Sequence, residues 1–435
     1  MNDSTIFALS SARGRAGVAV VRVSGAHALT TLRALGVRQP AARQARLATL
    51  TDPGSGETID RALVLWFPAP ASFTGEDVAE FHVHGGPAVI ASLLAALGRI
   101  DDCRLAEPGE FSRRAFENGK LDLTAAEGLA DLIEAETSAQ RRQALRQMGG
   151  AFERLTTDWA GRLVRCLAHL EAAIDFPDEE LPDDLVAGIT AEAASLAEAI
   201  QQHLADGRRG EILRDGMSVA LIGPPNCGKS SLLNALVGRE AAIVSAVAGT
   251  TRDVIEVHLD LGGIPVILAD TAGLRESADE IEQEGIRRAL ARAESSDIVL
   301  NILDATEPVS RETSLAGLAA GTVVTVWNKI DLAAPPPDTI GVSARTGAGL
   351  DRLILRLTEA AEQRMAGSPP IVTRQRHREA LENCLDALDR ARNAGESALL
   401  GEDLRLAVRA LGRITGKVDV EELLDIVFRD FCIGK

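Results

Sequence analysis

One segment near the middle of the chain constrains its fold more than any other. Residues 223–230 read Gly-Pro-Pro-Asn-Cys-Gly-Lys-Ser and fit the pattern G-x-x-x-x-G-K-[ST]. An apolar run of strand length (217–222) precedes them, and a helix-like stretch (231–238) follows. In that context the glycines let backbone N–H groups surround phosphate oxygens, and the helix adds its positive N-terminal end. The segment therefore predicts a phosphate-binding loop in an α/β domain.

The side chains of this loop have separate predicted roles. Lys229 can reach the β- and γ-phosphates, and the Ser230 hydroxyl can ligate Mg²⁺. The residues expected to contact the nucleotide in this loop are Asn226, Cys227, Gly228, Lys229, Ser230 and Ser231.

Three later segments each follow an apolar strand and complete a guanine-nucleotide pattern. Asp270 opens Asp-Thr-Ala-Gly and can hold Mg²⁺ through water, while Asp331 closes Asn-Lys-Ile-Asp and can accept from the N1 and N2 donors of guanine. The backbone of Ser343-Ala344 can contact the guanine O6. Ligands of open α/β sheets bind at the carboxyl ends of the strands, so four motifs in this order predict GTP binding and hydrolysis. The expected contacts are Asp270, Thr271, Ala272, Gly273, Asn328, Lys329, Asp331, Ser343 and Ala344.

A polar stretch between the first two motifs is a predicted switch loop. Its Thr251 is the expected second hydroxyl ligand of Mg²⁺, the alternative being a capped turn. Leu274 stands where Ras-like enzymes carry a water-orienting glutamine. The catalytic group must therefore come from elsewhere, and Glu282 is the first candidate, against the alternative of a solvated helix carboxylate. The expected nucleotide contacts in the switch loop are Ser245, Ala246, Val247, Ala248, Gly249, Thr250 and Thr251.

Sequence periodicity divides the rest of the chain. Strand-like and helix-like runs alternate over residues 1–118, whereas residues 119–210 and 366–435 have apolar positions at helical spacing. Residues 211–365 alternate strands and helices, which predicts a mostly parallel sheet with helices on both faces. The predicted fold is an N-terminal α/β domain followed by a helical domain that is interrupted by a Ras-like P-loop domain.

Composition narrows the function further. A net charge of −17 argues against a protein that binds nucleic acid with its whole surface. The five cysteines lack metal-ligand spacing, and their odd number argues against a disulfide framework. The N-terminus does not resemble a signal peptide, and no apolar segment is long enough to cross a bilayer. A cytoplasmic location without membrane contact is the expectation.

These motifs, taken with both ends of the chain, resemble the bacterial tRNA-modification GTPases called MnmE or TrmE. The matching segments are residues 14–25, 73–87 and 107–133, the three GTPase segments, and the last four residues, Cys-Ile-Gly-Lys. The resemblance covers essentially the whole chain. It implies an N-terminal domain that binds folate and mediates homodimerisation. The thiolate of Cys432, three residues from the end, would be a good nucleophile if nearby cations lowered its pKa, the alternative being a tail residue without chemistry.

The resemblance also assigns ligands by position. For 5-formyltetrahydrofolate or a related folate, the matching residues are Arg22, Glu80, Lys120 and Lys435. For a K⁺ ion that activates hydrolysis, they are Asn226, Ser245, Val247 and Thr250. Glu282 matches the catalytic glutamate of the family. Cys227 and Ser245 depart from the common alanine and threonine without affecting nucleotide binding.

The implied process is carboxymethylaminomethyl modification at C5 of the wobble uridine, position 34, in certain tRNAs. A flavoprotein partner of the MnmG or GidA type would supply the FAD chemistry, since this chain has no flavin motif. Two alternatives remain open: a ribosome-assembly GTPase, which would share the four GTPase motifs, and a folate-responsive regulatory protein whose GTPase only times complex formation.

Overall fold

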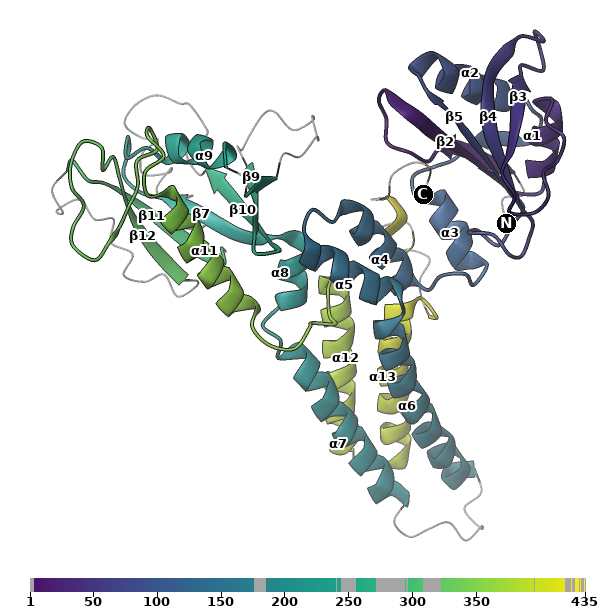
Figure 1. Cartoon of the computed structure of the whole chain (residues 1–435). Coiled ribbons are helices and arrows are strands. Elements are labelled where there is room, and N and C mark those ends of the chain that lie inside the picture. The colour runs from purple at the N-terminus through teal and green to yellow at the C-terminus, as the bar shows by residue number, and fades with distance from the viewer. Residues whose placement is uncertain are drawn as a thin grey trace, which may run out of the picture. The chain divides into compact units, whose positions relative to one another are not determined.

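The computed structural model describes residues 4–175, 185–239, 241–243, 256–270, 294, 296–307, 322–394, 396–418, 424, 427–429, 431 and 434. The chain forms two compact units (Figure 1). The first comprises residues 1–130, 148–165 and 408–435, and the second comprises residues 131–147 and 166–407. Each unit contains one β-sheet.

The sheet of the first unit is six-stranded, with the order β3-β4-β5-β2-β1-β6. Its neighbours pair antiparallel except β1 and β6, which are parallel. The alternating strand-like and helix-like runs predicted over residues 1–118 are confirmed, although the sequence did not separately indicate β3 or β6. The strands are β1 (Thr5–Leu9), β2 (Ala16–Ser24), β3 (Arg46–Thr51), β4 (Thr58–Phe67), β5 (Val78–Gly85) and β6 (Cys103–Leu105).

Two helices, α1 (Ala28–Ala34) and α2 (Pro87–Leu97), pack against one face of this sheet (Figure 1). Alternate residues of β2 and β5, such as Val21 and Phe81, are fully buried in the core beneath them. Because successive side chains of a strand point to opposite faces, the residues between them lie on the other face. That face carries the predicted folate residues Arg22 and Glu80.

The last residues of the chain pack into the first unit. Phe428 and Phe431 are buried with Leu123 in a cluster beside α3 (Glu110–Glu117). Gly109, with a φ of +67°, approaches the chain so closely that a Cβ there would lie 2.4 Å from the Phe428 carbonyl oxygen. A side chain at this position would displace the C-terminal segment.

Helices form the connection to and from the second sheet, as the helical spacing predicted. In the second unit, α7 packs along α12 (Figure 1). The helices are α4 (Leu123–Glu134), α5 (Ser138–Met148), α6 (Ala151–Asp175), α7 (Leu185–Leu204), α12 (Gln375–Arg392) and α13 (Ser397–Thr415).

The second sheet is seven-stranded, with the order β13-β12-β11-β7-β10-β9-β8. The five strands from β13 to β10 are parallel, and β9 and β8 continue the sheet antiparallel. The predicted parallel-rich sheet is confirmed. Its strands are β7 (Met217–Ile222), β8 (Ala242–Ile243), β9 (Glu256–Leu261), β10 (Ile264–Asp270), β11 (Ile298–Asp304), β12 (Thr322–Asn328) and β13 (Ile340–Gly341), and α9 (Lys229–Val237) and α11 (Leu350–Met365) pack with them.

The two connections between the helices and this sheet cross at one point. The outgoing connection runs through α8 (Arg209–Asp215), and the returning one reaches α12 through Val372. Gly210 of α8 is buried against the returning chain, and a Cβ there would lie 1.9 Å from the Val372 carbonyl oxygen. Beside this crossing, Arg378 donates to Glu211 at 2.7 Å and to Asp206 at 3.0 Å, so a buried ion network joins the two connections.

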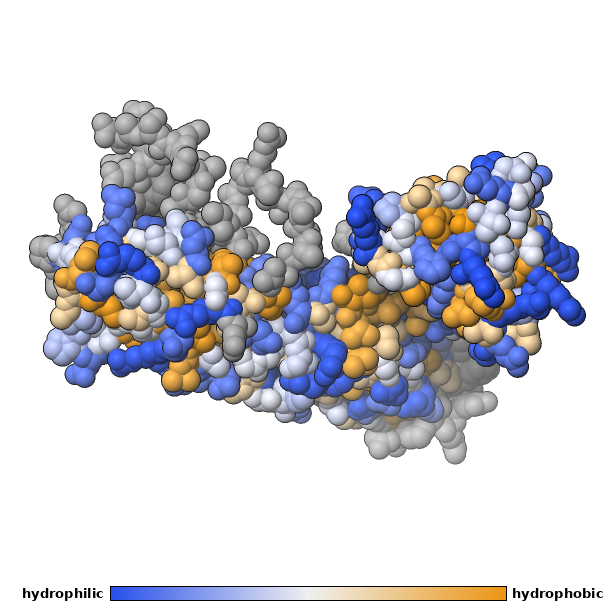
Figure 2. Space-filling model, turned by 45° about the horizontal axis from the view of Figure 1, so that its top comes forward, coloured by the Kyte–Doolittle hydropathy of each residue, from blue (hydrophilic) through white to orange (hydrophobic). Residues whose placement is uncertain are grey.

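Figure 2 shows hydrophobic residues exposed in several separate patches among hydrophilic ones. Among the residues that the structure describes, no helix combines the length and the apolar character that a membrane span requires.

Candidate functional site

The phosphate-binding loop follows β7, the strand of the second sheet from which the strand order runs in opposite directions. Strand β7 lies between β10 on one side and β11 on the other, both parallel to it. Such a switch point, at the carboxyl ends of parallel strands, leaves a crevice in which ligands bind. Residues 223–228 follow β7 at this place, and α9 begins at Lys229.

The backbone of this loop has the conformation that phosphate binding requires. Gly228 has a φ of +94° and Asn226 a φ of +60°, so the chain turns through left-handed conformations before α9 begins. The Lys229 ammonium lies within the loop, donating to the carbonyl oxygens of Gly223 and Pro224 at 2.9 Å each. Together with the N-terminus of a nine-residue helix, these groups form a cradle for a polyphosphate. The donor set therefore fits the nucleotide that the sequence predicts.

Asn328 joins this loop to the segment at Ala344 that is predicted to contact the guanine base. Its side-chain amide donates to the Cys227 carbonyl oxygen at 2.9 Å, and its Oδ1 accepts from the Ala344 N–H at 3.2 Å. The residue is only 2% exposed, and a Cβ on Gly228 would lie 2.3 Å from its Nδ2. Residues of three predicted motifs are thus brought together by one amide.

Asp331 and Ser343 also meet, as their predicted roles require. The Ser343 hydroxyl donates to the Asp331 carboxylate at 2.6 Å, and Arg345 lies 3.0 Å from the same carboxylate. The hydrogen bond from Ser343 lowers the pKa of Asp331 below its usual value, and Arg345 contributes in the same direction. Asp331 is consequently an ionised acceptor at neutral pH, which suits the two donors on the Watson–Crick edge of guanine.

Three more of the predicted nucleotide-binding residues lie in described elements, and the others lie outside the described part of the chain. Asp270 ends β10 with its backbone beside Leu221 of β7, at the same edge of the sheet as the phosphate-binding loop. Ser230 and Ser231 lie in the first turn of α9. The predicted residues outside the described ranges are Ser245, Ala246, Val247, Ala248, Gly249, Thr250, Thr251, Thr271, Ala272, Gly273, Glu282, Cys432 and Lys435.

Sequence reasoning missed one charged residue of this site. Asp304 ends β11, the strand between β7 and β12, and its carboxylate accepts from the Lys329 ammonium at 2.5 Å. Burial alone would raise the pKa of Asp304, but hydrogen bonds from Lys329 and Thr306 outweigh this effect and lower it. The available signal was its position: like Asp270 and Asn328, Asp304 is the last residue of a strand.

Two of the predicted folate residues, Arg22 and Glu80, lie side by side on the face of the first sheet opposite α1 and α2. Arg22 donates to Glu80 across neighbouring strands at 3.0 Å, and its guanidinium lies 5.2 Å and 5.8 Å from the ring centres of Phe73 and Phe111. Lys120 lies near Gly75, since a Cβ there would be 3.4 Å from its Cε. A guanidinium beside two aromatic rings and a carboxylate offers charge and hydrogen-bonding groups to a ligand such as the predicted folate.

The C-terminus lies close to this region. Gly434, with a φ of +97°, is so near β1 that a Cβ would lie 2.2 Å from the Leu9 carbonyl oxygen. Ser10, the next residue, pairs with Val20 of β2, two positions before Arg22. Cys432, two residues before Gly434, and Lys435, the residue after it, are outside the described residues.

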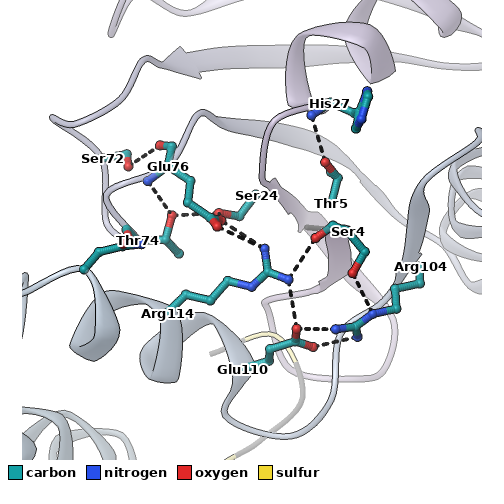
Figure 3. A network of polar contacts seen from close by, with 11 residues as sticks. Ser4, Thr5, Ser24, His27, Ser72, Thr74, Glu76, Arg104, Glu110 and Arg114 are labelled. Carbon is teal, nitrogen blue, oxygen red and sulfur yellow. Dashed lines mark hydrogen bonds and ion pairs between the residues drawn. The ribbon is translucent and has the colours of Figure 1, made fainter. Parts of the chain in front are cut away.

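An ion network joins α3 to segments at the ends of the strands (Figure 3). Arg114 of α3 binds Glu76 at 3.1 Å, Glu110 at 3.0 Å and the Ser4 carbonyl oxygen at 2.9 Å. Arg104 donates to both carboxylate oxygens of Glu110, at 2.8 Å and 2.5 Å, so Oε1 accepts from both arginines. Glu76 and Arg114 belong to two segments on which the family resemblance depended, and in the folded chain they hold the strands and α3 together.

These features define the class of protein: along the chain, an N-terminal α/β domain is followed by a helical domain into which a P-loop GTPase domain is inserted. A model of the MnmE helical domain matches residues 123–432, and a model of the GTP-binding protein TrmE N-terminus matches residues 5–120. The tRNA modification GTPase MnmE of Parvibaculum lavamentivorans is 59% identical, covering 99% of this chain and all of that protein. The chain therefore belongs to the MnmE family and is a GTP hydrolase.

Other relatives match over similar lengths. The tRNA modification GTPase MnmE of Rhodospirillum rubrum is 54% identical, with both chains covered completely. The human mitochondrial protein named 5-taurinomethyluridine-[tRNA] synthase subunit GTPB3 is 48% identical over the whole of this chain and 94% of its own length.

Proposed function

We propose that this GTPase uses K⁺ to activate hydrolysis and couples the reaction to carboxymethylaminomethyl modification at C5 of uridine 34 in certain tRNAs. A flavoprotein of the MnmG or GidA type supplies the FAD chemistry, and the chain works as a cytoplasmic homodimer. Family membership supports this proposal over the ribosome-assembly alternative. The folate-responsive alternative makes a different claim, namely that uridine modification continues in cells that lack the chain.

The observation that carries the catalytic part of the proposal is the conformation of Asn226. This residue is exposed at the turn of the phosphate-binding loop and has a φ of +60°, so its amide oxygen is available to a cation beside the β- and γ-phosphates. Ser245, Val247 and Thr250 would complete the K⁺ site, while Ser230 and Thr251 would ligate Mg²⁺. A positive charge there offsets the charge that develops in phosphoryl transfer, as an arginine finger does in other GTPases. Glu282 would orient the attacking water.

The experiment compares steady-state GTP hydrolysis in KCl and in NaCl at matched ionic strength. We expect hydrolysis to be about 100-fold faster in K⁺, because removing one group that stabilises transition-state charge typically costs 10²–10³ in rate. Asn226→Ala should abolish most of the K⁺ response while GDP binding is retained. Equal rates in the two salts would contradict the K⁺ assignment and point to an external activator.

The first unit is the proposed folate site, formed by Arg22, Glu80, Lys120 and Lys435. Arg22→Met removes a charged donor and should weaken 5-formyltetrahydrofolate binding at least about tenfold, the effect of one hydrogen bond to a charged group. Isothermal titration calorimetry measures this directly. Arg46→Met, an exposed arginine on the edge strand β3 of the same sheet, is the matched control and should bind normally. Unchanged affinity in Arg22→Met would place the ligand elsewhere. In this proposal Cys432 acts in the chemistry near the folate.

A further inference from the structure

The ends of β11 and β12 are fastened to each other beside the base-reading loop. Asp304 and Asn328 are register partners, and the Ala305 N–H donates to the Asn328 carbonyl oxygen at 2.9 Å. Asp304 is only 8% exposed, and both oxygens of its carboxylate accept hydrogen bonds from this junction. Its Oδ1 accepts from the Thr306 N–H at 2.9 Å and hydroxyl at 2.7 Å, and its Oδ2 accepts from Lys329 at 2.5 Å.

Lys329 occupies a conformation that an L-residue seldom adopts. Its φ is +64°, in the left-handed region that favours glycine. The residue stands between Asn328, which holds the phosphate-binding loop, and the turn that presents Asp331. The contact with Asp304 anchors the Lys329 side chain, and that anchor opposes relaxation of the backbone into an ordinary conformation.

We propose that Asp304 is a positioning residue for guanine recognition, acting through its ion pair with Lys329. The carboxylate fixes Lys329, and Lys329 in turn fixes the distance and direction from which Asp331 meets the Watson–Crick edge of the base. This inference rests on the proposed role of Asp331 as the acceptor for guanine. A residue of this kind affects the choice of base more than the binding of phosphate.

The amide variant Asp304→Asn separates this role from a simple turn cap. Its Oδ1 can still accept from Thr306, but its Nδ2 would face the Lys329 ammonium, so that two donors oppose each other. The substitution removes the negative charge of residue 304 and its hydrogen bond from Lys329, while the shape of the side chain is preserved. A thermal unfolding curve in parallel verifies that the variant is folded.

Binding is measured by fluorescence titration with a labelled GDP, followed by competition with GDP and IDP, whose hypoxanthine base lacks the 2-amino group. We expect Asp304→Asn to weaken GDP binding about tenfold, the effect of one lost hydrogen bond between charged groups. The ratio of GDP affinity to IDP affinity should fall, because the displaced Asp331 no longer accepts a hydrogen bond from the 2-amino group of guanine. In a Lys329→Met background, Asp304→Asn should have no additional effect.

Asp297→Asn provides the matched control. Asp297 precedes the other end of β11, accepts from Ser218, and is partly buried, but it lies at the edge of the sheet away from the nucleotide. The Asp297→Asn variant should bind GDP with the same affinity as the unmodified chain. Unchanged GDP affinity and base preference in Asp304→Asn, with binding lost in Asp331→Asn, would overturn the role of Asp304 alone. Unchanged binding in both variants would overturn the guanine site itself.

Discussion

Replacing Asp331 with asparagine should cost at least about 100-fold in GTP affinity and should create binding of xanthine nucleotides. A site whose buried polar groups match a base rejects one that leaves them unpaired, and this discrimination is large. Guanine presents two donors, N1–H and the 2-amino group, to the two oxygens of Asp331. Xanthine presents a carbonyl oxygen at position 2 instead, which an amide N–H can meet.

Competition of GTP, XTP and ATP against a fluorescent nucleotide measures this switch. Asp338→Asn is a suitable control, since Asp338 is exposed in the same loop and has a φ of +58°, a conformation that asparagine also tolerates. The control should retain GTP specificity. If Asp331→Asn keeps its affinity for GTP and does not accept XTP, another residue reads the base.

The second large effect concerns the stability of the first unit. Arg114 is only 7% exposed and is shared by Glu76 and Glu110 (Figure 3). Arg114→Met fills similar space but leaves two carboxylates without this partner. Removing one member of a buried ion pair typically costs about 3–5 kcal/mol, because the remaining charge stays desolvated. We expect a destabilisation of that size, concentrated in β1, β2 and α3.

Hydrogen–deuterium exchange measured by segment should show faster exchange in residues 4–24 and 110–117 and no change in β7 or β12. Arg113→Met is the control on the same helix. Arg113 is 40% exposed and pairs with Glu117 one turn away, so its loss should cost about 0.5 kcal/mol or less. Equal protection in both variants would mean that the network around Arg114 does not hold the sheet to α3.

Burial raises and Arg104 lowers the pKa of Glu110, and the net shift is downward. A lowered pKa stabilises the folded state at pH values above the pKa of the unfolded chain. This contribution is lost as the pH falls through the folded-state pKa. The comparison of Arg114→Met with Arg113→Met is therefore made at neutral pH, where Glu110 is ionised.

Local patterns were sufficient to predict the second sheet and to place several candidate nucleotide-binding residues at one edge of it. Strands such as β7 and β11 are mostly apolar because both faces of a parallel sheet are covered. The glycines and charged residues that follow them lie at one edge because parallel strands end there. Asn328, Asp331 and Ser343 could be placed on this basis, and the structure brings them together.

Other features depend on contacts between residues distant in the chain. Strand β3 has mixed exposure and no continuous apolar run, so its sequence did not predict a strand. Glu76 and Arg114 are 38 residues apart, and neither differs from an ordinary surface charge until the sheet and α3 are packed. Asp304 was missed because an aspartate at the end of a strand is also a common way to begin a turn.

The crossing of Gly210 and Val372 has a consequence for chain entropy. Closing a loop costs conformational entropy that grows only slowly with length, provided that its ends can meet. At this crossing the two ends of the inserted domain are already in contact. The entropic cost of inserting the nucleotide-binding domain into the helical domain is therefore about that of closing a long surface loop. The helices on either side of the insertion, α7 and α12, pack against each other, so the ends of the inserted domain are held together by the scaffold itself.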